Sequence, residues 1–308
     1  MLGWFLALVL AAPPAWHSIV ASPAGAVAVS DGHEVRLTHD HGATWTSVLA
    51  GEGVVDALAL AADGSLYVSR GQRLGVRTPR GLERWTRLPG RRGLALVANG
   101  GRVAWLADGG SHEGERWYVS IDDGATFRPR VGWSVGNNHN ALALAADGRV
   151  QLMWGVEAPC GGGYQARALG RAWDEELAPA DFPLDRPYDW MPHANGWVFT
   201  PGDCGASDDD HDAWCAVSPA GELHRLPIAF PRGAPAALVA AEGPRAWLLA
   251  GGRLAVARGR GARPLTRDAP VDAAALAVAN GEPWVLTTGA RVLAYRDGAW
   301  VDVSPSPR

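Results

Sequence analysis

The sequence predicts an all-β protein, and three features of the chain support this fold class. Of its 308 residues, 39 are Gly and 22 are Pro, and both residue types are unfavourable inside helices. Short apolar segments recur along the whole chain, each followed by a glycine turn and a second apolar segment. No stretch with helical periodicity separates them, apart from a short candidate at 171–178. A protein of long helices and a two-domain α/β protein are therefore excluded.

Seven copies of the repeated unit follow one another, and each has room for four short strands. The first strands with their turns cover residues 19–25, 57–64, 94–101, 141–148, 190–196, 237–243 and 275–281. The second strands cover residues 27–29, 66–68, 103–105, 150–152, 197–199, 246–248 and 284–286. An isolated four-stranded sheet cannot cover both of its faces, so such units gain cover from neighbours in a ring. We predict a seven-bladed β-propeller of four-stranded antiparallel blades. The fifth blade is the least certain, because Pro192 interrupts its first strand, and a propeller of six blades is the alternative.

The repeats also set the expected domain boundaries. Residues 1–12 are apolar over too few positions to span a bilayer, and small residues with prolines follow, as in a signal peptide. No Arg precedes Arg36, so the usual basic leader is missing and a buried strand is the alternative. We expect a signal peptide at 1–15, export to the periplasm or the extracellular space, and no stable membrane insertion. One propeller then spans 16–308, with blades at 16–52, 53–90, 91–132, 133–182, 183–230, 231–268 and 269–308.

Two turns carry a more specific motif. Thr38–Trp45 and Ser120–Phe127 both read Ser/Thr-x-Asp-x-Gly-x-Thr-aromatic. This pattern resembles the Asp-box, or BNR repeat, of sialidase-like propellers. Degenerate copies are found at Thr78 with Trp85, at Trp173 and at Asp297–Trp300. The resemblance implies a propeller fold, in agreement with the repeats.

The motif is predicted to be a structural turn between the third and fourth strands of a blade. Its aspartates can accept hydrogen bonds from turn amides, its glycines can adopt a positive φ, and its aromatic residues can pack between blades. The structural residues are Asp40, Gly42, Thr44, Trp45, Asp122, Gly124, Thr126 and Phe127, with Trp85, Trp173 and Trp300 at equivalent outer-strand positions. The two aspartates are therefore not expected to be catalytic acids.

Long loops are predicted to gather on the face opposite the Asp-boxes. The three glycine-to-glycine intervals between Gly101 and Gly243 are longer than the others by about nine residues, and up-and-down connectivity places the extra chain on that face. Polar and aromatic residues in these loops of blades 3 to 5 suit a glycan, peptide or protein ligand; ordinary solvated loops are the alternative. The candidate ligand-binding residues are His112, Glu113, Asn138, His139, Tyr164, Tyr188, Asp189, Trp190, His193 and Asp203.

An acidic run in the fifth blade is the one candidate metal site with a regular spacing. Its alternating carboxylates are Asp208, Asp210 and Asp212, and carboxylate oxygens are the ligands that Ca²⁺ prefers. The run lacks the glycine and the distal glutamate of an EF-hand loop, so a solvated acidic loop is favoured and no other cofactor is expected. A zinc site would need His139, His193 and His211 to converge with a cysteine.

Three cysteines suit an oxidising compartment with one disulfide and one free thiol. The favoured pair is Cys204 with Cys215, because these residues flank one loop whose strands at 197–199 and 214–217 are expected to be neighbours. The alternative pairs Cys160 with Cys204 between adjacent blades and leaves Cys215 reduced within a strand.

Charge and composition narrow the function class. The net charge is −4, which gives no attraction for polyanions, so nucleic acid is not an expected partner. The chain has no Lys, which excludes Schiff-base and P-loop lysine chemistry.

The resemblance to sialidases implies an arginine clamp and a Tyr nucleophile, yet the Phe/Tyr-Arg-Ile-Pro segment before the first Asp-box is missing. We expect a non-catalytic module that binds a glycan, peptide or protein; a glycoside hydrolase or lyase and an assembly scaffold are the alternatives. The oligomeric state is left open.

Overall fold

The computed structural model describes residues 16–89, 92–108, 115–129, 141–144, 150–156, 163–168, 180–182, 191–192, 198–201, 213–218, 222–229, 238–242, 245–266 and 268–306. These residues form strands and turns and contain no helix, so the all-β class predicted from the sequence is confirmed for them. None of them belongs to a helix that could span a membrane. The segments at 1–15 and 171–178 lie outside the described residues.

The strands form antiparallel sheets of four, and the strands of each sheet follow one another in the chain. The N-terminal sheets comprise β1 (Ser18–Ala21), β2 (Val27–Ser30), β3 (Val35–Thr38) and β4 (Thr46–Val48); β5 (Val55–Leu60), β6 (Leu66–Arg70), β7 (Arg73–Arg77) and β8 (Glu83–Arg87); and β9 (Arg92–Asn99), β10 (Arg102–Asp108), β11 (Glu115–Ser120) and β12 (Arg128–Pro129). The middle sheets comprise β13 (Ala141–Leu144), β14 (Val150–Val156), β15 (Gly163–Ala168) and β16 (Ala180–Phe182); and β17 (Met191–Pro192), β18 (Val198–Pro201), β19 (Ala213–Val217) and β20 (Leu223–Ala229). The C-terminal sheets comprise β21 (Leu238–Glu242), β22 (Arg245–Ala250), β23 (Arg253–Arg258) and β24 (Gly261–Thr266); and β25 (Ala273–Ala279), β26 (Glu282–Thr287), β27 (Val292–Arg296) and β28 (Ala299–Asp302).

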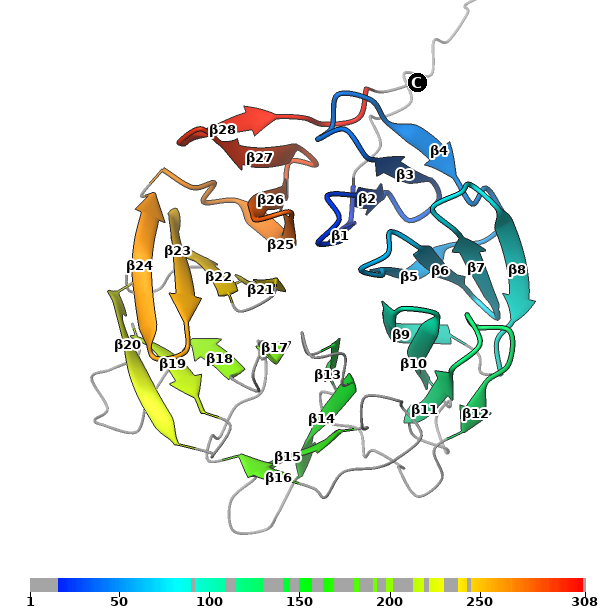
Figure 1. Ribbon diagram of the computed structural model, residues 1–308, viewed down its shortest axis with the longest axis horizontal. Coiled ribbons are helices and arrows are strands. Elements are labelled where there is room, and N and C mark those ends of the chain that lie inside the picture. The colour runs from blue at the N-terminus through cyan, green and yellow to red at the C-terminus, as the bar shows by residue number, and fades with distance from the viewer. Residues whose placement is uncertain are drawn as a thin grey trace, which may run out of the picture.

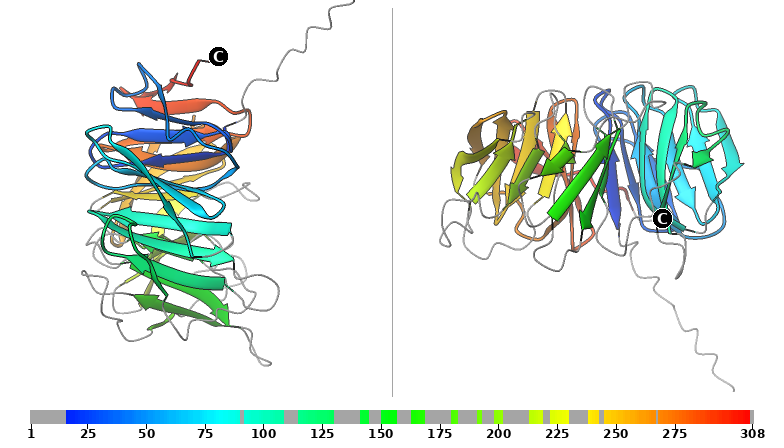
Figure 2. Two further views of the ribbon diagram at one scale, coloured as in Figure 1. Left: turned by 90° about the vertical axis from the view of Figure 1, so that its right-hand side faces the viewer. Right: turned by 90° about the horizontal axis from the view of Figure 1, so that it is seen from below.

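The sheets stand around a central axis, with the first strand of each nearest the centre and the fourth at the rim (Figure 1). Seen from the side, they form a flattened disc (Figure 2). First strands of successive sheets contact one another, and β25 contacts β1, so the ring is closed. Small residues such as Ala57 and Ala59 on β5 suit these inner strands, where the sheets converge.

The turns after the first strands follow the expected pattern. Gly25, Gly64, Gly101 and Gly281 all have a positive φ, a conformation that glycine adopts without steric cost. The strand that contains Pro192 is the shortest of the inner strands: β17 has two residues, and Pro192 pairs with Val198 at its end. A proline has no N–H to donate, which limits such a strand.

Aromatic side chains near the fourth strands fill the spaces between sheets. Each described one lies in a cluster shared with the preceding sheet. The Trp45 ring meets Trp284 of the preceding sheet at a centroid distance of 6.4 Å. Phe127 and Trp300 also meet aromatic rings of their own sheets, Trp105 at 6.4 Å and Tyr295 at 5.2 Å. Trp85 lies in the cluster between the first two sheets. Trp45 and Phe127 directly precede their strands, whereas Trp85 and Trp300 lie within β8 and β28, because the shorter turns let those strands begin earlier. Trp173 is outside the described residues.

The ring closes between the first and last sheets without exchange of a strand. The C-terminal segment, residues 303–306, runs from β28 onto the first sheet, where Trp45 Nε1 donates to the Val303 carbonyl at 2.9 Å. The buried Arg36 donates to the Ser306 carbonyl at 2.5 Å. Arg296, from β27, donates to the carbonyl of His41. Hydrogen bonds and side-chain packing therefore hold this seam together.

Candidate functional site

The two Ser/Thr-x-Asp turns have the same hydrogen bonds. In the first, Asp40 Oδ1 accepts from the Thr44 amide at 2.9 Å and Asp40 Oδ2 from the Thr44 hydroxyl at 2.5 Å, while the Gly42 amide donates to Thr38 Oγ1 at 3.0 Å. The second turn repeats these contacts: the Thr126 amide and hydroxyl donate to Asp122 at 2.9 and 2.6 Å, and the Gly124 amide donates to Ser120 Oγ at 2.8 Å. Gly42 and Gly124 have φ values of 82° and 76°. Both aspartates are thus engaged in holding a turn.

These hydrogen bonds also set the acidity of the two carboxyl groups. Those from the Thr44 hydroxyl, the Thr44 amide and Thr38 lower the pKa of Asp40 to about 2. For Asp122, slight burial raises the pKa, but the hydrogen bonds from Ser120 and Thr126 outweigh it and lower the pKa to about 2. Both groups are therefore carboxylates at neutral pH and serve as acceptors.

We predict that Asp122→Ala lowers the free energy of unfolding by about 1 kcal/mol at pH 7, since the exposed turn loses its acceptors but water replaces part of them. Because the folded pKa lies below the ordinary value of about 4, this stabilisation is present above pH 4 and is lost as the pH falls toward 2. Urea unfolding of wild type and variant at several pH values measures both effects. Ile121→Ala, at an exposed neighbour, is the control, and a difference that grows below pH 4 would contradict the prediction.

Each of these turns covers an aromatic residue on the second strand of the preceding sheet. Asp123 Oδ1 accepts from the Tyr67 hydroxyl at 3.0 Å, and its carbonyl oxygen accepts from Arg84. Burial and the neighbouring Asp123 raise the pKa of Tyr67 above its ordinary range. A Cβ atom at Gly42 would lie 2.8 Å from Val303 Cβ and 3.3 Å from the Trp284 ring, and the φ of 82° also favours glycine, so the turn packs directly on these two residues. Tyr67 and Trp284 are both fully buried beneath their turns.

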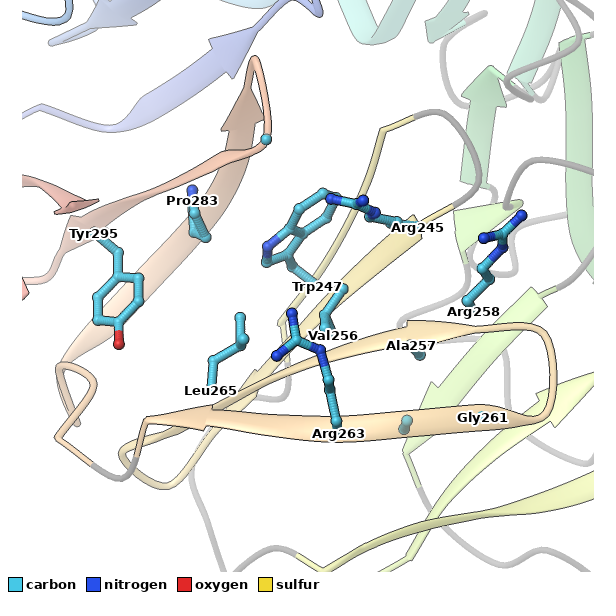
Figure 3. Close-up of a pocket in the computed structure, with 12 residues that line it drawn as sticks. Arg245, Trp247, Val256, Ala257, Arg258, Gly261, Arg263, Leu265, Pro283 and Tyr295 are labelled. Carbon is cyan, nitrogen blue, oxygen red and sulfur yellow. The ribbon is translucent and has the colours of Figure 1, made fainter. Parts of the chain in front are cut away.

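The last sheet has a much shorter turn at the corresponding place, and an open groove lies beside it. Eight residues separate the paired Val119 and Arg128 in the third sheet, whereas two separate Arg296 and Ala299. The groove of about 520 Å³ lies between the β21–β24 and β25–β28 sheets (Figure 3). It is lined by Arg245, Trp247, Val256, Ala257, Arg258, Gly261, Ala262, Arg263, Leu265, Gly281, Pro283 and Tyr295.

Strand register places the polar and apolar wall residues of the groove on one face of the β21–β24 sheet. Trp247 pairs with Val256, and Val256 pairs with Arg263, so these three form a row across β22, β23 and β24. Arg245 and Arg258 lie two residues from this row toward the turns and on the same face, because side chains alternate along a strand. Figure 3 shows Arg245 and Arg263 beside Trp247, with Pro283 and Tyr295 on the facing sheet.

The groove is strongly cationic within an acidic protein. Residues 238–266 contain five arginines and one carboxylate, whereas the whole chain has a net charge of −4. Arg245, Arg258 and Arg263 are exposed, and none makes an ion pair with a described residue. Arginine is always protonated and presents several N–H donors, so the groove is suited to bind anionic oxygen atoms.

Of the binding and metal residues predicted from the long loops, Tyr164 lies in the described part of the chain. Tyr164 lies on β15, opposite Phe182 of β16 and Gly155 of β14. The other candidates lie outside the described residues: His112, Glu113, Asn138, His139, Tyr188, Asp189, Trp190, His193, Asp203, Asp208, Asp210 and Asp212. In the described part of the chain, no three His, Cys, Asp or Glu side chains gather as metal ligands.

Cys215 lies on β19, is fully buried and forms a disulfide. Its partner is outside the described residues, as both Cys160 and Cys204 are. A pair formed by Cys160 and Cys204 would leave Cys215 reduced, which is incompatible with this bond. The pairing of Cys204 with Cys215 stays a prediction.

The groove was not predicted from the sequence. Its basic residues are not consecutive: Arg258 and Arg263 lie on either side of a tight turn, and strand pairing places them on one face of the sheet. The signal was present as the spacing of Arg258, Arg260 and Arg263 around two glycines. A hairpin read with its register would have brought Arg258 and Arg263 to one face.

Comparison with known proteins identifies the fold. No protein-family model and no curated protein matches the sequence. Among solved structures, the chain is similar to Kuenenia stuttgartiensis hydrazine synthase, with a TM-score of 0.61, 12% identity and coverage of 96% of this chain and 99% of that chain. It is also similar to YCF48 bound to D1 peptide, with a TM-score of 0.59, 12% identity and coverage of 96% of this chain and 93% of that chain. For a chain of the mitotic checkpoint complex the TM-score is 0.57 and the identity 12%, with coverage of 92% of this chain and 85% of that chain. At these identities the likeness shows the β-propeller fold alone.

Proposed function

We propose that this chain is an exported, non-catalytic β-propeller that binds a peptide or protein partner. The observation that carries the proposal is the groove between the β21–β24 and β25–β28 sheets, where exposed guanidinium groups lie beside Trp247 and Tyr295 lies on the facing sheet. Arginine keeps its proton at neutral pH and so supplies binding rather than proton transfer. Aromatic rings beside such groups favour a ligand with both charged and apolar parts. The peptide in the YCF48 structure supports this kind of partner.

We further propose that residues 16–308 form one ring of seven blades and that its two Ser/Thr-x-Asp turns are Asp-boxes. The closed contacts among first strands support the ring, and the repeated hydrogen bonds at Asp40 and Asp122 support the assignment of the turns. The loops of blades 3 to 5 remain a proposed second contact surface on the opposite face of the disc.

A capture experiment followed by reconstitution tests the function. The tagged mature chain is incubated with periplasm or medium of the source organism, each captured protein is purified separately, and its affinity is measured by calorimetry. We expect at least one purified protein to bind directly. A glycan array and an assay for glycoside cleavage are run in parallel. Glycan binding without any direct protein partner, or turnover of a glycoside, would overturn the proposal.

A further inference from the structure

We propose that the groove between the β21–β24 and β25–β28 sheets is a receptor for an aspartate-bearing turn of a partner protein. The inference rests on the proposed function and names the chemistry that the groove recognises. It follows from a comparison of this groove with the filled interface between the β5–β8 and β9–β12 sheets of the same molecule.

The filled interface shows how a turn is held. Tyr67 pairs with Val76, and Val76 pairs with Arg84, so these residues form a row across β6, β7 and β8. The turn of the next sheet lies on this row: the Asp123 carboxylate accepts from the Tyr67 hydroxyl at 3.0 Å, and the Asp123 carbonyl accepts from Arg84. In this interface the aromatic residue binds the side chain of the turn through its hydroxyl, and the arginine binds the backbone carbonyl of the same residue.

The groove presents the same row without such a turn from its neighbouring sheet. Trp247, Val256 and Arg263 occupy the strand positions that correspond to Tyr67, Val76 and Arg84, as the pairing register shows. The hairpin of the neighbouring sheet, Arg296–Ala299, is too short to form the eight-residue turn found at Ser120–Phe127. The row consequently borders an open groove in which Arg263 is exposed, whereas Trp247 is buried at its base, with 3% of its surface accessible.

Two residues beside the row differ between the groove and the filled interface, and both differences increase the preference of the groove for an anion. Arg245 stands where the filled interface has Ser65, two residues before the aromatic residue of the row. Arg258 stands where the filled interface has Thr78, two residues after the central valine of the row. Three exposed guanidinium groups thus line one groove, which suits a turn with one or two carboxylates, since each charge-assisted hydrogen bond is stronger than a neutral one.

The charge distribution favours a short acidic peptide segment over a polyanion. The three arginines lie within one groove, and the remainder of a chain with net charge −4 repels an extended nucleic acid or sulfated glycan. The half-buried side chains of Val256 and Leu265 give a peptide side chain an apolar surface to pack against.

A synthetic cyclic peptide based on residues 120–127 tests the inference. It contains Ser-Ile-Asp-Asp-Gly-Ala-Thr-Phe, and its matched control has only the second aspartate, which corresponds to Asp123, replaced by asparagine, so that the turn-forming Asp122 is kept. Fluorescence anisotropy of the labelled peptides is measured against the mature chain and its variants. We expect saturable binding of the acidic peptide and binding of the asparagine peptide weaker by about tenfold. The Arg263→Gln variant should bind the acidic peptide with an affinity about tenfold lower than that of the wild type.

Two variants control for charge and for position. Arg260→Gln removes the same charge from the same hairpin but outside the groove lining, and its affinity for the acidic peptide should stay within about twofold of wild type. Arg84→Gln removes the corresponding arginine of the filled interface and should leave peptide binding unchanged. Circular dichroism melting shows that each variant is folded.

Several outcomes would overturn the inference. These are equal affinity for the two peptides, no binding of either, or an Arg263→Gln variant that binds as wild type does. Displacement by heparin with equal contributions from Arg260 and Arg263 would indicate a polyanion site, and a dimer lost in Arg263→Gln would indicate a second copy of the chain. If no peptide binds but a captured protein does, the inference fails and the proposed function stands. If the acidic peptide binds but no captured protein does, the result refutes the proposed function alone.

Discussion

Trp284→Ala is expected to lower the free energy of unfolding by about 3 to 5 kcal/mol, the largest effect of a single substitution in the described core. The side chain is fully buried in the cluster that joins the last sheet to the first, and its ring meets that of Trp45 edge to face at 6.4 Å. Its removal leaves a cavity at the seam of the ring. Guanidinium unfolding monitored by far-UV circular dichroism measures the loss.

Trp284→Phe is the matched variant. The indole N–H of Trp284 has no hydrogen-bond partner among the described residues, so phenylalanine removes an unsatisfied donor and retains most of the apolar contact. We expect a loss of about 1 kcal/mol. An alanine variant that is no less stable than the phenylalanine variant would show that the seam does not depend on this packing.

Removal of residues 303–308 is expected to have the second largest effect, a loss of about 3 kcal/mol. The truncated chain loses the carbonyl acceptors of Trp45 and Arg36 and the packing of Val303 in the cluster at the seam. Arg36 is buried, so an acceptor lost there is costly. Thermal and denaturant unfolding measure the change. Removal of residues 307–308 alone is the control and should leave stability unchanged; equal stability of both truncations would refute the role of the segment.

The sequence predicted the fold well because its signal is local and repeated. Alternating apolar residues such as Ala57–Leu60 and a glycine turn at Gly64 specify a hairpin without reference to the remainder of the chain. The turn at Ser120–Phe127 was likewise readable, since an aspartate four residues before a threonine amide reaches it within one turn.

The groove could not be predicted in the same way, because it depends on a difference between neighbouring sheets. Arg263 is an ordinary exposed strand residue until its register opposite Val256 and Trp247 is known. The open space beside it depends in addition on the length of the turn after Arg296, in another sheet. Each of these turns is a local feature, but the groove depends on how the two sheets lie beside each other, which no single segment of the sequence shows. The proposed long-loop residues, such as His139 and Asp203, lie outside the described part of the chain.

The absence of strand exchange among the described sheets has a consequence for how the chain acquires its structure during synthesis. Each of these sheets contains strands that are consecutive in sequence, so every sheet can pair internally as soon as its own residues have left the ribosome. Contacts between distant parts of the sequence are concentrated where β25 and the segment 303–306 meet the first sheet. The ring can therefore close only after β25 and the segment 303–306 have been synthesised.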